Sequence, residues 1–518
     1  MAADNSMKPF GGLQDTFLNC LRKEKVPVTV HVVNGYQLNH LLIIGFDSYA
    51  ILAEAGGKQM LLYKHAISTI TPERAIVIEP GGLKKEEMNQ NQKNPPYAAF
   101  SISERAQAFV KAAEENLIPV FARIEATEYS NQAKVLHALQ REKIALHHFT
   151  PTTGYGYDDI GRDTLDRVFA YALDAEDALV RPQFTSGTHA IFTALAGLLE
   201  PGDCMLSATG RPYDTLEKAI GISGDAYGSL RRMGISYKEV PLTETGCINV
   251  EAVVSTLLQT QASVVYFQRS RGYSWRNALL PETDLATAFD AVRKAKPDCI
   301  IVVDNCYGEF TRTSEPAAFG ADVEIGSLIK NPGGGIAPTG GYIAGTHACI
   351  ERIAERLTVP GMGREVGSYA GSYAPFYQGL FLAPHITAQS LKTAALFARA
   401  FEACGMETLP SSDAERSDIV QSLRFSTAEA LIAFCRSIQA ASPVDSFVVP
   451  EPWDMPGYTS QVIMAAGAFV QGSSIELSAD APIKKPYTAY VQGGLTYAHG
   501  RLGVMLALDA LWKLNICG

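Results

Sequence analysis

The hydrophobic pattern at the start of the chain predicts one helix followed by short strands. Apolar residues recur at helical spacing from Leu13 to Glu24, and Val26-Pro27 ends this predicted helix. Runs rich in Val, Ile, Leu and Tyr follow at residues 27–33, 37–46, 49–54, 59–63 and 66–71. The pairs Asn34-Gly35 and Gly56-Gly57 are hairpin signals between runs. One helix and five close strands predict a small, strongly bent antiparallel barrel.

A change of pattern after residue 98 predicts a second, larger architecture. A helical region covers residues 102–145, and strand-like and helical runs then alternate up to residue 304. This alternation is typical of a mostly parallel sheet with helices on both faces. The residues after 375, with a long helical stretch near 386–404, predict a smaller α+β subdomain.

These patterns divide the chain into four parts. The predicted barrel domain covers residues 1–79, and a polar stretch rich in Asn, Gln, Lys and Glu forms a linker at 80–97. The large sheet domain covers residues 98–375, and the small subdomain covers 376–518. A flexible linker of this length spans roughly 20–25 Å root-mean-square. The two folded parts are therefore expected to orient independently.

Charge and cysteine usage narrow the class of protein. Acidic residues outnumber basic ones 54 to 44, and the net charge of -10 excludes a uniformly basic coat for nucleic acid over the whole chain. Residues 1–78 carry a net charge of +1, so a near-neutral front is joined to an acidic body. The nine cysteines include no C-x-x-C pair, and no apolar run reaches 18 residues. We expect a reduced, soluble, cytoplasmic protein without a metal site.

Three segments of the predicted sheet domain carry candidate chemistry. Ser186-Gly187-Thr188 lies between a strand and an Ala-rich helix, where free N–H groups suit a phosphate. Asp304 ends an apolar strand, at the edge where α/β sheets place ligands. Lys330 precedes three glycines, and a lysine beside a dry pocket can form a Schiff base. Taken singly, each segment has a structural alternative: a helix cap, a structural carboxylate or a solvated lysine.

Taken together, the three segments are similar to those of fold-type I pyridoxal phosphate (PLP) enzymes. The resemblance is strongest to the cystathionine and methionine γ-lyase-related group that includes the aluminium resistance proteins. It covers about residues 100–518, including the stretches 155–162, 268–273 and 491–496. It implies elimination at Cβ or Cγ of an amino-acid substrate, with racemisation and transamination left open.

The resemblance also implies a role for each site residue. Lys330 would hold PLP covalently and move protons at Cα, while Asp304 would keep the pyridine nitrogen protonated. Tyr213 would stack on the ring, although a core-packed aromatic is the alternative. The residues implied at the phosphate are Ser186, Gly187, Thr188 and Ser327, and Tyr157 would reach the phosphate of a neighbouring subunit.

A few positions depart from the pattern of this group. Asp159 stands where relatives place the arginine of the cross-subunit contact, and Arg162 is the possible replacement. Ile329 removes a hydroxyl that relatives place just before the lysine. We interpret Cys306 as a packing residue and His189 as a helix-turn histidine.

A substrate carboxylate is expected to meet an arginine, because the guanidinium fork matches its geometry. By local resemblance, Arg501 is the first candidate. The rival candidates are Arg269, Arg271 and Arg364.

The predicted barrel carries basic and aromatic residues that suit single-stranded RNA. Arg22, Lys23 and Lys25 cluster at the end of the predicted helix, and Lys64-His65 follows a strand. Cations hold phosphates and aromatic rings stack on bases. The structural alternative for the first cluster is a solvated helix end, favourable against the helix dipole.

Residues 10–74 resemble Hfq, the bacterial Sm-like RNA chaperone, most clearly in the stretch Tyr63–Thr69. The resemblance implies a hexameric ring that binds small regulatory RNA and mRNA. It places Gln14, Phe46, Ser48, Tyr49, Lys64 and His65 at the proximal, uridine-binding face, and Arg22, Lys23 and Lys25 at the rim. It places His31, Gly35, Tyr36, Gln37, Leu38 and Asn39 at the distal, purine-binding face. Two of these positions depart from the family, because many members have glutamine in place of Ser48 and an aromatic residue in place of His31.

The sequence therefore predicts an Hfq-like RNA-binding subunit fused to a PLP-dependent carbon–sulfur-lyase-like domain. The lyase-like domain is expected to pair as a dimer and the front domain to form a ring of six, an arrangement that three dimers under one ring would satisfy. One rival hypothesis is an RNA chaperone whose large domain is an inert scaffold. The other is an enzyme whose front domain only oligomerises.

Overall fold

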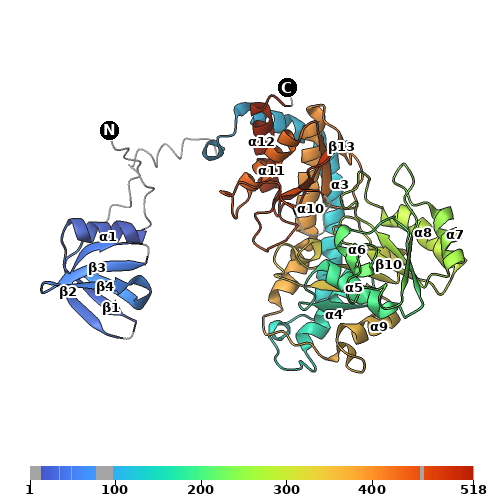
Figure 1. Cartoon of the computed structure of the whole chain (residues 1–518), viewed down its shortest axis with the longest axis horizontal. Coiled ribbons are helices and arrows are strands. Elements are labelled where there is room, and N and C mark those ends of the chain that lie inside the picture. Colours follow the sequence, from blue (N-terminus) through green and yellow to red (C-terminus); the bar gives the residue numbers. More distant parts are fainter. Residues whose placement is uncertain (1–12, 34, 48, 77–96, 455–459, 517–518) are drawn as a thin grey trace. The chain divides into compact units, whose positions relative to one another are not determined.

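The computed structural model describes residues 13–33, 35–47, 49–76, 97–454 and 460–516. They form two compact units, one within residues 1–101 and one within residues 102–518 (Figure 1). Apart from its last residue, the predicted linker at 80–97 lies outside the described residues, and so do Asn34 and Ser48. Within the described ranges, no helix is both long and apolar enough to cross a membrane.

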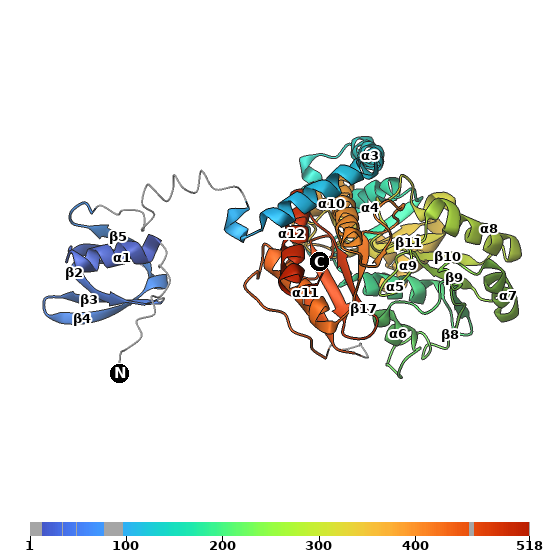
Figure 2. The same ribbon diagram turned by 90° about the horizontal axis from the view of Figure 1, so that it is seen from above.

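The first unit consists of one helix and a five-stranded antiparallel sheet. Its elements are α1 (Leu13–Lys23), β1 (Val28–Val32), β2 (Gln37–Phe46), β3 (Ala50–Ala55), β4 (Lys58–Tyr63) and β5 (Ile67–Pro72). The strands pair in the order β4-β3-β2-β1-β5 (Figure 2). The predicted helix and five strands are confirmed.

The barrel predicted for this unit is not closed within one chain. A 3-10 turn at Lys64–Ala66 joins β4 to β5, but it carries the chain from one edge of the sheet to the other and forms no hairpin. Among the described residues, β4 and β5 do not pair with each other. Two sheet edges therefore keep backbone groups that are available for pairing.

The core of the first unit is small. Leu18 and Leu21 of α1 pack against Val28, Leu41 and Ile51 of the sheet. Large apolar side chains of the same unit remain exposed, namely Val33, Tyr36, Leu42, Ile44, Tyr49, Leu61 and Tyr63. A domain of this size buries a smaller share of its surface than a larger one does.

The second unit is built on a seven-stranded, mostly parallel sheet. Its strands are β6 (Asp177–Arg181), β7 (Cys204–Ser207), β8 (Ser236–Glu239), β9 (Val264–Gln268), β10 (Ile300–Asp304), β11 (Val323–Ser327) and β12 (Gly341–Gly345). Their order is β6-β12-β11-β10-β9-β7-β8, and β12 runs antiparallel to both of its neighbours. The predicted fold class is confirmed.

Helices cover both faces of this sheet. They are α3 (Glu104–Arg141), α4 (Ile160–Ala172), α5 (Gly187–Leu198), α6 (Asp214–Ile220), α7 (Val250–Thr260), α8 (Ala286–Ala295), α9 (His347–Leu357) and α10 (Ala374–Ala403). Along β9, Val264 and Tyr266 join the core under α5 and α9, whereas Val265 and Phe267 join the core under α7 and α8. This alternation follows from the two-residue period of a strand.

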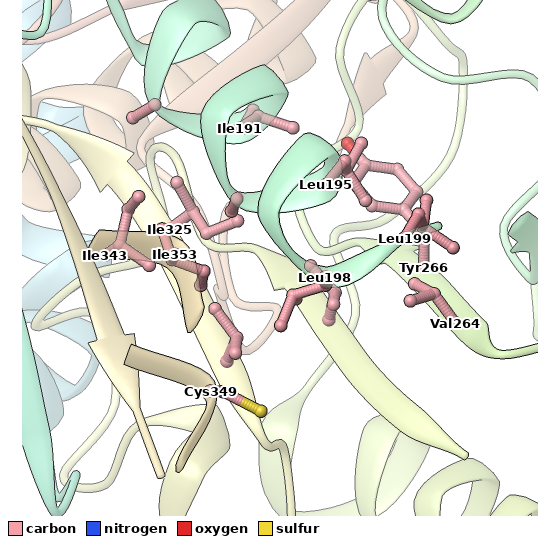
Figure 3. Close-up of a cluster of buried hydrophobic side chains, with 14 of the residues drawn as sticks. Ile191, Leu195, Leu198, Leu199, Val264, Tyr266, Ile325, Ile343, Cys349 and Ile353 are labelled. Atoms are coloured by element: carbon pink, nitrogen blue, oxygen red, sulfur yellow. The ribbon is translucent and has the colours of Figure 1, made fainter. Parts of the chain in front are cut away.

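Helix α5 is fixed firmly on the sheet. Figure 3 shows Ile191, Leu195 and Leu198 of α5 facing Ile325 and Ile343 of the strands. This packing holds the first turn of α5 beside the carboxyl ends of β10 and β11.

The C-terminal subdomain is an antiparallel sheet with helices. Its elements are β13 (Thr408–Leu409), β14 (Val420–Phe425), α11 (Ala428–Ala441), β15 (Val462–Ala465), β16 (Ser478–Pro482), β17 (Tyr487–Gln492) and α12 (Tyr497–Lys513), with the strand order β13-β14-β17-β16-β15. The helix expected near 386–404 begins earlier, at Ala374, because Pro384 is accommodated inside it.

Candidate functional site

A cavity of about 330 Å³ lies at the carboxyl ends of the central parallel strands. Asp304 at the end of β10, Ser327 at the end of β11 and Lys330 in the following loop all line it. The opposite wall comes from the C-terminal subdomain, through Met464, Gly472, Ser474 and Asp480. Three of the segments singled out in the sequence thus meet in one cavity.

The first turn of α5 forms an anion-sized corner of this cavity. The Ser186 hydroxyl caps the helix by accepting the backbone N–H of His189 at 3.1 Å. Gly187 leaves the corner open, because a Cβ there would lie 3.3 Å from both the Cys306 sulfur and the Ser327 Cβ. The Ser327 hydroxyl is buried without a hydrogen-bond partner among the described residues. N–H groups at a helix start and an unpartnered hydroxyl fit the phosphate of PLP.

Asp304 is held rigidly at the floor of the cavity. Its carboxylate accepts the backbone N–H of Cys306 at 3.1 Å and the Tyr266 hydroxyl at 3.2 Å. Burial raises the pKa of Asp304, while the nearby Lys330 opposes that shift. A buried carboxylate of this kind gains stability from a cationic partner, as a protonated pyridine nitrogen would be.

Lys330 points at an aromatic ring beside this carboxylate. Its Nζ lies 3.9 Å from the centre of the Tyr307 ring, and the Tyr307 hydroxyl donates to Ser474 Oγ at 3.2 Å. Tyr307 has φ +71°, which is unusual for a bulky residue and sets its ring under the lysine. Burial lowers the pKa of the Lys330 ammonium, but Cys306, Tyr307 and Asp304 raise it by more, so the net shift is upward.

Tyrosines and a second carboxylate also line the cavity. The backbone N–H of Tyr213 donates to Gln268 Oε1 at 2.9 Å, and the rings of Tyr213 and Tyr273 lie 5.8 Å apart. Asp480 on β16 accepts Gln492 Nε2 at 3.4 Å. Burial raises the pKa of Asp480 to about 6, against hydrogen bonds from Tyr273 and Gln492 that lower it.

In the first unit, several of the predicted RNA-contact residues lie together. Lys64 Nζ is 5.2 Å from the centre of the Phe46 ring, and its backbone N–H donates to the Tyr49 carbonyl at 2.8 Å. Lys64 and Gln14 line one hollow of about 210 Å³. His65 stacks on Tyr63 with ring centres 5.7 Å apart. Lys64 Nζ also lies 3.4 Å from Asp15, so its charge is already partly compensated.

The rim and distal residues lie elsewhere on this unit. Arg22, Lys23 and Lys25 are exposed at the end of α1, and Arg22 donates to the Asn19 side chain. His31 on β1 pairs with Gln37 on β2, Leu38 and Asn39 follow on β2, and Tyr36 is exposed.

Comparison with known proteins matches both units. The family model for methionine gamma-lyase matches residues 106–512, and the model for Hfq protein matches residues 13–77. The RNA-binding protein Hfq of Clostridium kluyveri is 49% identical over 76 residues, which cover 14% of this chain and 92% of that protein. The chain belongs to the methionine gamma-lyase family, and its first unit to the Hfq family.

Similar proteins of the methionine gamma-lyase family extend over most of the second unit. The uncharacterised protein YnbB of Bacillus subtilis is 48% identical over 404 residues, covering 78% of this chain and 96% of that protein. A carbon-sulfur lyase involved in aluminum resistance from Clostridium novyi NT is 50% identical in its crystal structure, with a TM-score of 0.77. That match covers 83% of this chain and 99% of the other. The resemblances drawn from the sequence are therefore confirmed.

All four candidate carboxylate arginines of the gamma-lyase unit already pair with carboxylates of the protein. Arg501 pairs with Glu114 of α3 at 2.8 Å. Arg269 and Arg271 are buried and pair with Glu315 at 3.0 Å and Asp418 at 2.9 Å. Arg364 pairs with Asp177 at 2.6 Å. None of these four side chains is among the described residues that line the cavity, so Arg501 stays a prediction without geometric support in one subunit.

Tyr157 also lies outside this cavity. Its side chain is 58% exposed, as a residue reaching a neighbouring subunit would be. Asp159 caps α4 by accepting the backbone N–H of Arg162, and the buried Arg162 side chain donates to the Gly156 carbonyl. Arg162 thus shapes the loop that carries Tyr157.

Cys306 and His189 behave as structural residues. Burial raises the pKa of the Cys306 thiol well above its usual range, which removes the nucleophilic thiolate. His189 Nδ1 accepts the backbone N–H of Thr185 at 3.2 Å, within the helix-start turn.

Three residues that line the cavity were not predicted from the sequence, namely Tyr307, Ser474 and Asp480. Tyr307 stands three positions after Asp304 in the same segment of the sequence. This proximity was the available signal that Tyr307 lies at the site. Ser474 and Asp480 come from a different subdomain and enter the cavity only through tertiary packing. Local sequence carried no signal for them.

Proposed function

We propose that the second unit is a PLP-dependent carbon–sulfur lyase that acts on an amino acid. The observation that carries this proposal is one cavity containing Lys330, Asp304 and the unpartnered Ser327 hydroxyl at the start of α5. Its products would be a thiol, a 2-oxo acid and ammonia, with β- and γ-elimination both compatible. The rival hypothesis of an inert scaffold does not explain why a lysine and a buried carboxylate share this cavity.

Each side chain of the cavity has a defined task in this proposal. When bound, PLP supplies an electron sink for the carbanion at Cα. Lys330 would hold the cofactor aldehyde covalently, then carry the Cα proton between substrate and leaving group. Asp304 would pair with the pyridine nitrogen and keep it protonated. Ser186, Gly187, Thr188 and Ser327 would bind the phosphate, and Tyr213 would cover the ring.

The lyase proposal is tested by product analysis on the PLP-loaded full chain. A panel of sulfur-containing amino acids should yield thiol and 2-oxo acid in equal amounts. Lys330→Ala should abolish both products, while Lys218→Ala, an exposed lysine on α6, should leave them unchanged. Products from neither wild type nor the Lys218→Ala protein would contradict lyase activity.

We also propose that the first unit binds single-stranded RNA, including small regulatory RNA and mRNA, in the cytoplasm. The supporting observation is that Lys64 and Gln14 line one hollow, while Lys64 Nζ lies 5.2 Å from the centre of the Phe46 ring. Unpaired edges at β4 and β5 support assembly of this unit into a ring, with six subunits expected from the family. The gamma-lyase units would then pair as dimers within the same assembly.

RNA binding is tested by fluorescence anisotropy with a uridine-rich oligonucleotide at several salt concentrations. Lys64→Ala should weaken binding and flatten the slope of log affinity against log salt by about 0.7 per lost contact. Lys58→Ala, an exposed lysine at the start of β4, is the matched control. Equal, salt-insensitive binding by all three proteins would favour a front unit that only oligomerises.

A further inference from the structure

A second cavity, separate from the lyase cavity, lies where α3, α10 and two loop segments of the second unit meet. Its volume is about 60 Å³. Helix α3 contributes Arg123 and Thr127, the segment after β10 contributes Thr311 and Arg312, and the segment before β14 contributes Ala414 to Arg416. It shares no lining residue with the lyase cavity.

The side chain that distinguishes this cavity is Arg416. It is only 6% exposed, and within the described ranges its one hydrogen bond runs from Nη2 to Gln421 Oε1 at 2.8 Å. Its Nε and Nη1 are buried without an acceptor among the described residues. A buried charge that lacks its hydrogen bonds is costly, so arginines in protein interiors are normally paired.

Two other buried arginines nearby illustrate that normal arrangement. Arg269 reaches Glu315 at 3.0 Å and three further acceptors, and Arg271 reaches both oxygens of Asp418. No carboxylate of the described residues lies within 4 Å of Arg416. Burial and the nearby Arg271 lower the pKa of Arg416 to about 9, although Asp418 and Glu402 act in the opposite direction.

The remaining charges around the cavity favour an anion. Arg123 donates to the Asp413 carbonyl at 2.8 Å and forms no ion pair with a described carboxylate. Arg312 pairs with Glu415 at 3.3 Å and with Glu282. Of the charged side chains that line the cavity, three are arginines and one is a carboxylate.

We propose that this cavity binds a small oxyanion, with Arg416 as its buried ligand and Arg123 and Arg312 at its mouth. The volume is about twice the share of one water molecule in the liquid, which suits a phosphate ion or a single carboxylate group. The bound anion would link α3, the segment after β10 and the segment leading into β14. It would therefore tie the C-terminal subdomain to the large sheet.

Calorimetric titration of the PLP-loaded full chain with inorganic phosphate tests this proposal, with chloride keeping the ionic strength constant. PLP fills the phosphate corner at α5, so that corner does not compete. We expect one saturable binding event per chain, weakened at least tenfold by Arg416→Gln and severalfold by Arg123→Gln. The control is Arg232→Gln, whose arginine pairs with Asp225 on an exposed surface and should change nothing.

A second variant and a competing anion test the proposed oxyanion site independently of Arg416→Gln. If Arg416→Gln does not fold, the exposed Arg123→Gln protein decides, since its side chain is not part of the core. Competition by acetate would identify a carboxylate as the natural occupant, and indifference to acetate would identify phosphate. Absence of saturable binding, or equal binding by all variants, would overturn the proposal and leave ordered water as the occupant. These variants report on this site even if the chain takes up no PLP, because they leave the corner at α5 unchanged.

Discussion

The two units of this chain complete their structures in different ways. The first unit has a small core, exposed apolar side chains and two unpaired sheet edges. The second unit covers both faces of its sheet with helices and forms a cavity from its own strand ends. The first unit therefore leaves strand edges and apolar side chains open for association, whereas the second unit encloses its cavity within one subunit.

The largest expected effect is on the chemistry of the second unit. Asp304→Asn removes the charge that would hold the pyridine nitrogen protonated, so turnover should fall roughly 10²–10³-fold, the scale of losing one preorganised electrostatic partner. The first unit should be unaffected, and RNA binding should stay at the wild-type level. Steady-state kinetics and anisotropy on the same preparation check both statements. Unchanged turnover would remove Asp304 from the reaction.

A change at the edge of the first sheet should alter the assembly of the first unit and leave the turnover of the second unit unchanged. Leu61 on β4 is 58% exposed, and Leu61→Asp places a charge on an edge strand, which disfavours pairing with another strand. Light scattering should report a smaller assembly, while lyase turnover per chain stays constant. An assembly of unchanged mass would show that this part of β4 takes no part in association.

A smaller effect is expected from filling the phosphate corner. Gly187→Ala adds a Cβ 3.3 Å from Cys306 and Ser327, so either these neighbours or the phosphate must shift. The dissociation constant for PLP should rise about tenfold, which corresponds to about 1.4 kcal/mol. Equilibrium dialysis measures it. Wild-type affinity in this variant would argue that the phosphate binds elsewhere.

The strand ends explain how far prediction from the sequence could go. Asp304, Ser327 and Lys330 follow short apolar runs, and parallel strands bring such positions to one edge. The path from β4 to β5 through Lys64–Ala66 was not predictable in the same way, because pairing between strands is a tertiary choice. For the same reason, the engagement of Arg501 by Glu114 could not be foreseen. The local pattern around Arg501 resembles a family position, but its partner comes from a distant helix.

The last expected effect is on stability and concerns Asp480 and pH. Burial raises the pKa of Asp480 to about 6, above the ~4 of an unfolded aspartate. Protonation of Asp480 therefore stabilises the folded state relative to the unfolded state. This stabilisation is fully present below pH 4 and is lost as the pH rises through 6. The side chain in Asp480→Asn stays neutral at every pH. Above pH 7 the free energy of unfolding of this variant should therefore be about 1–3 kcal/mol higher than that of the wild type. Urea unfolding at pH 4 and pH 8 should find this difference only at pH 8.

The central claim is that Lys330 captures PLP beside Asp304, and the visible absorbance of the purified full chain tests it most directly. We expect a visible band after incubation with PLP and gel filtration. Lys330→Ala should lack this band while keeping the wild-type fold by circular dichroism. A colourless wild-type protein, or a band that survives unchanged in Lys330→Ala, would contradict the claim.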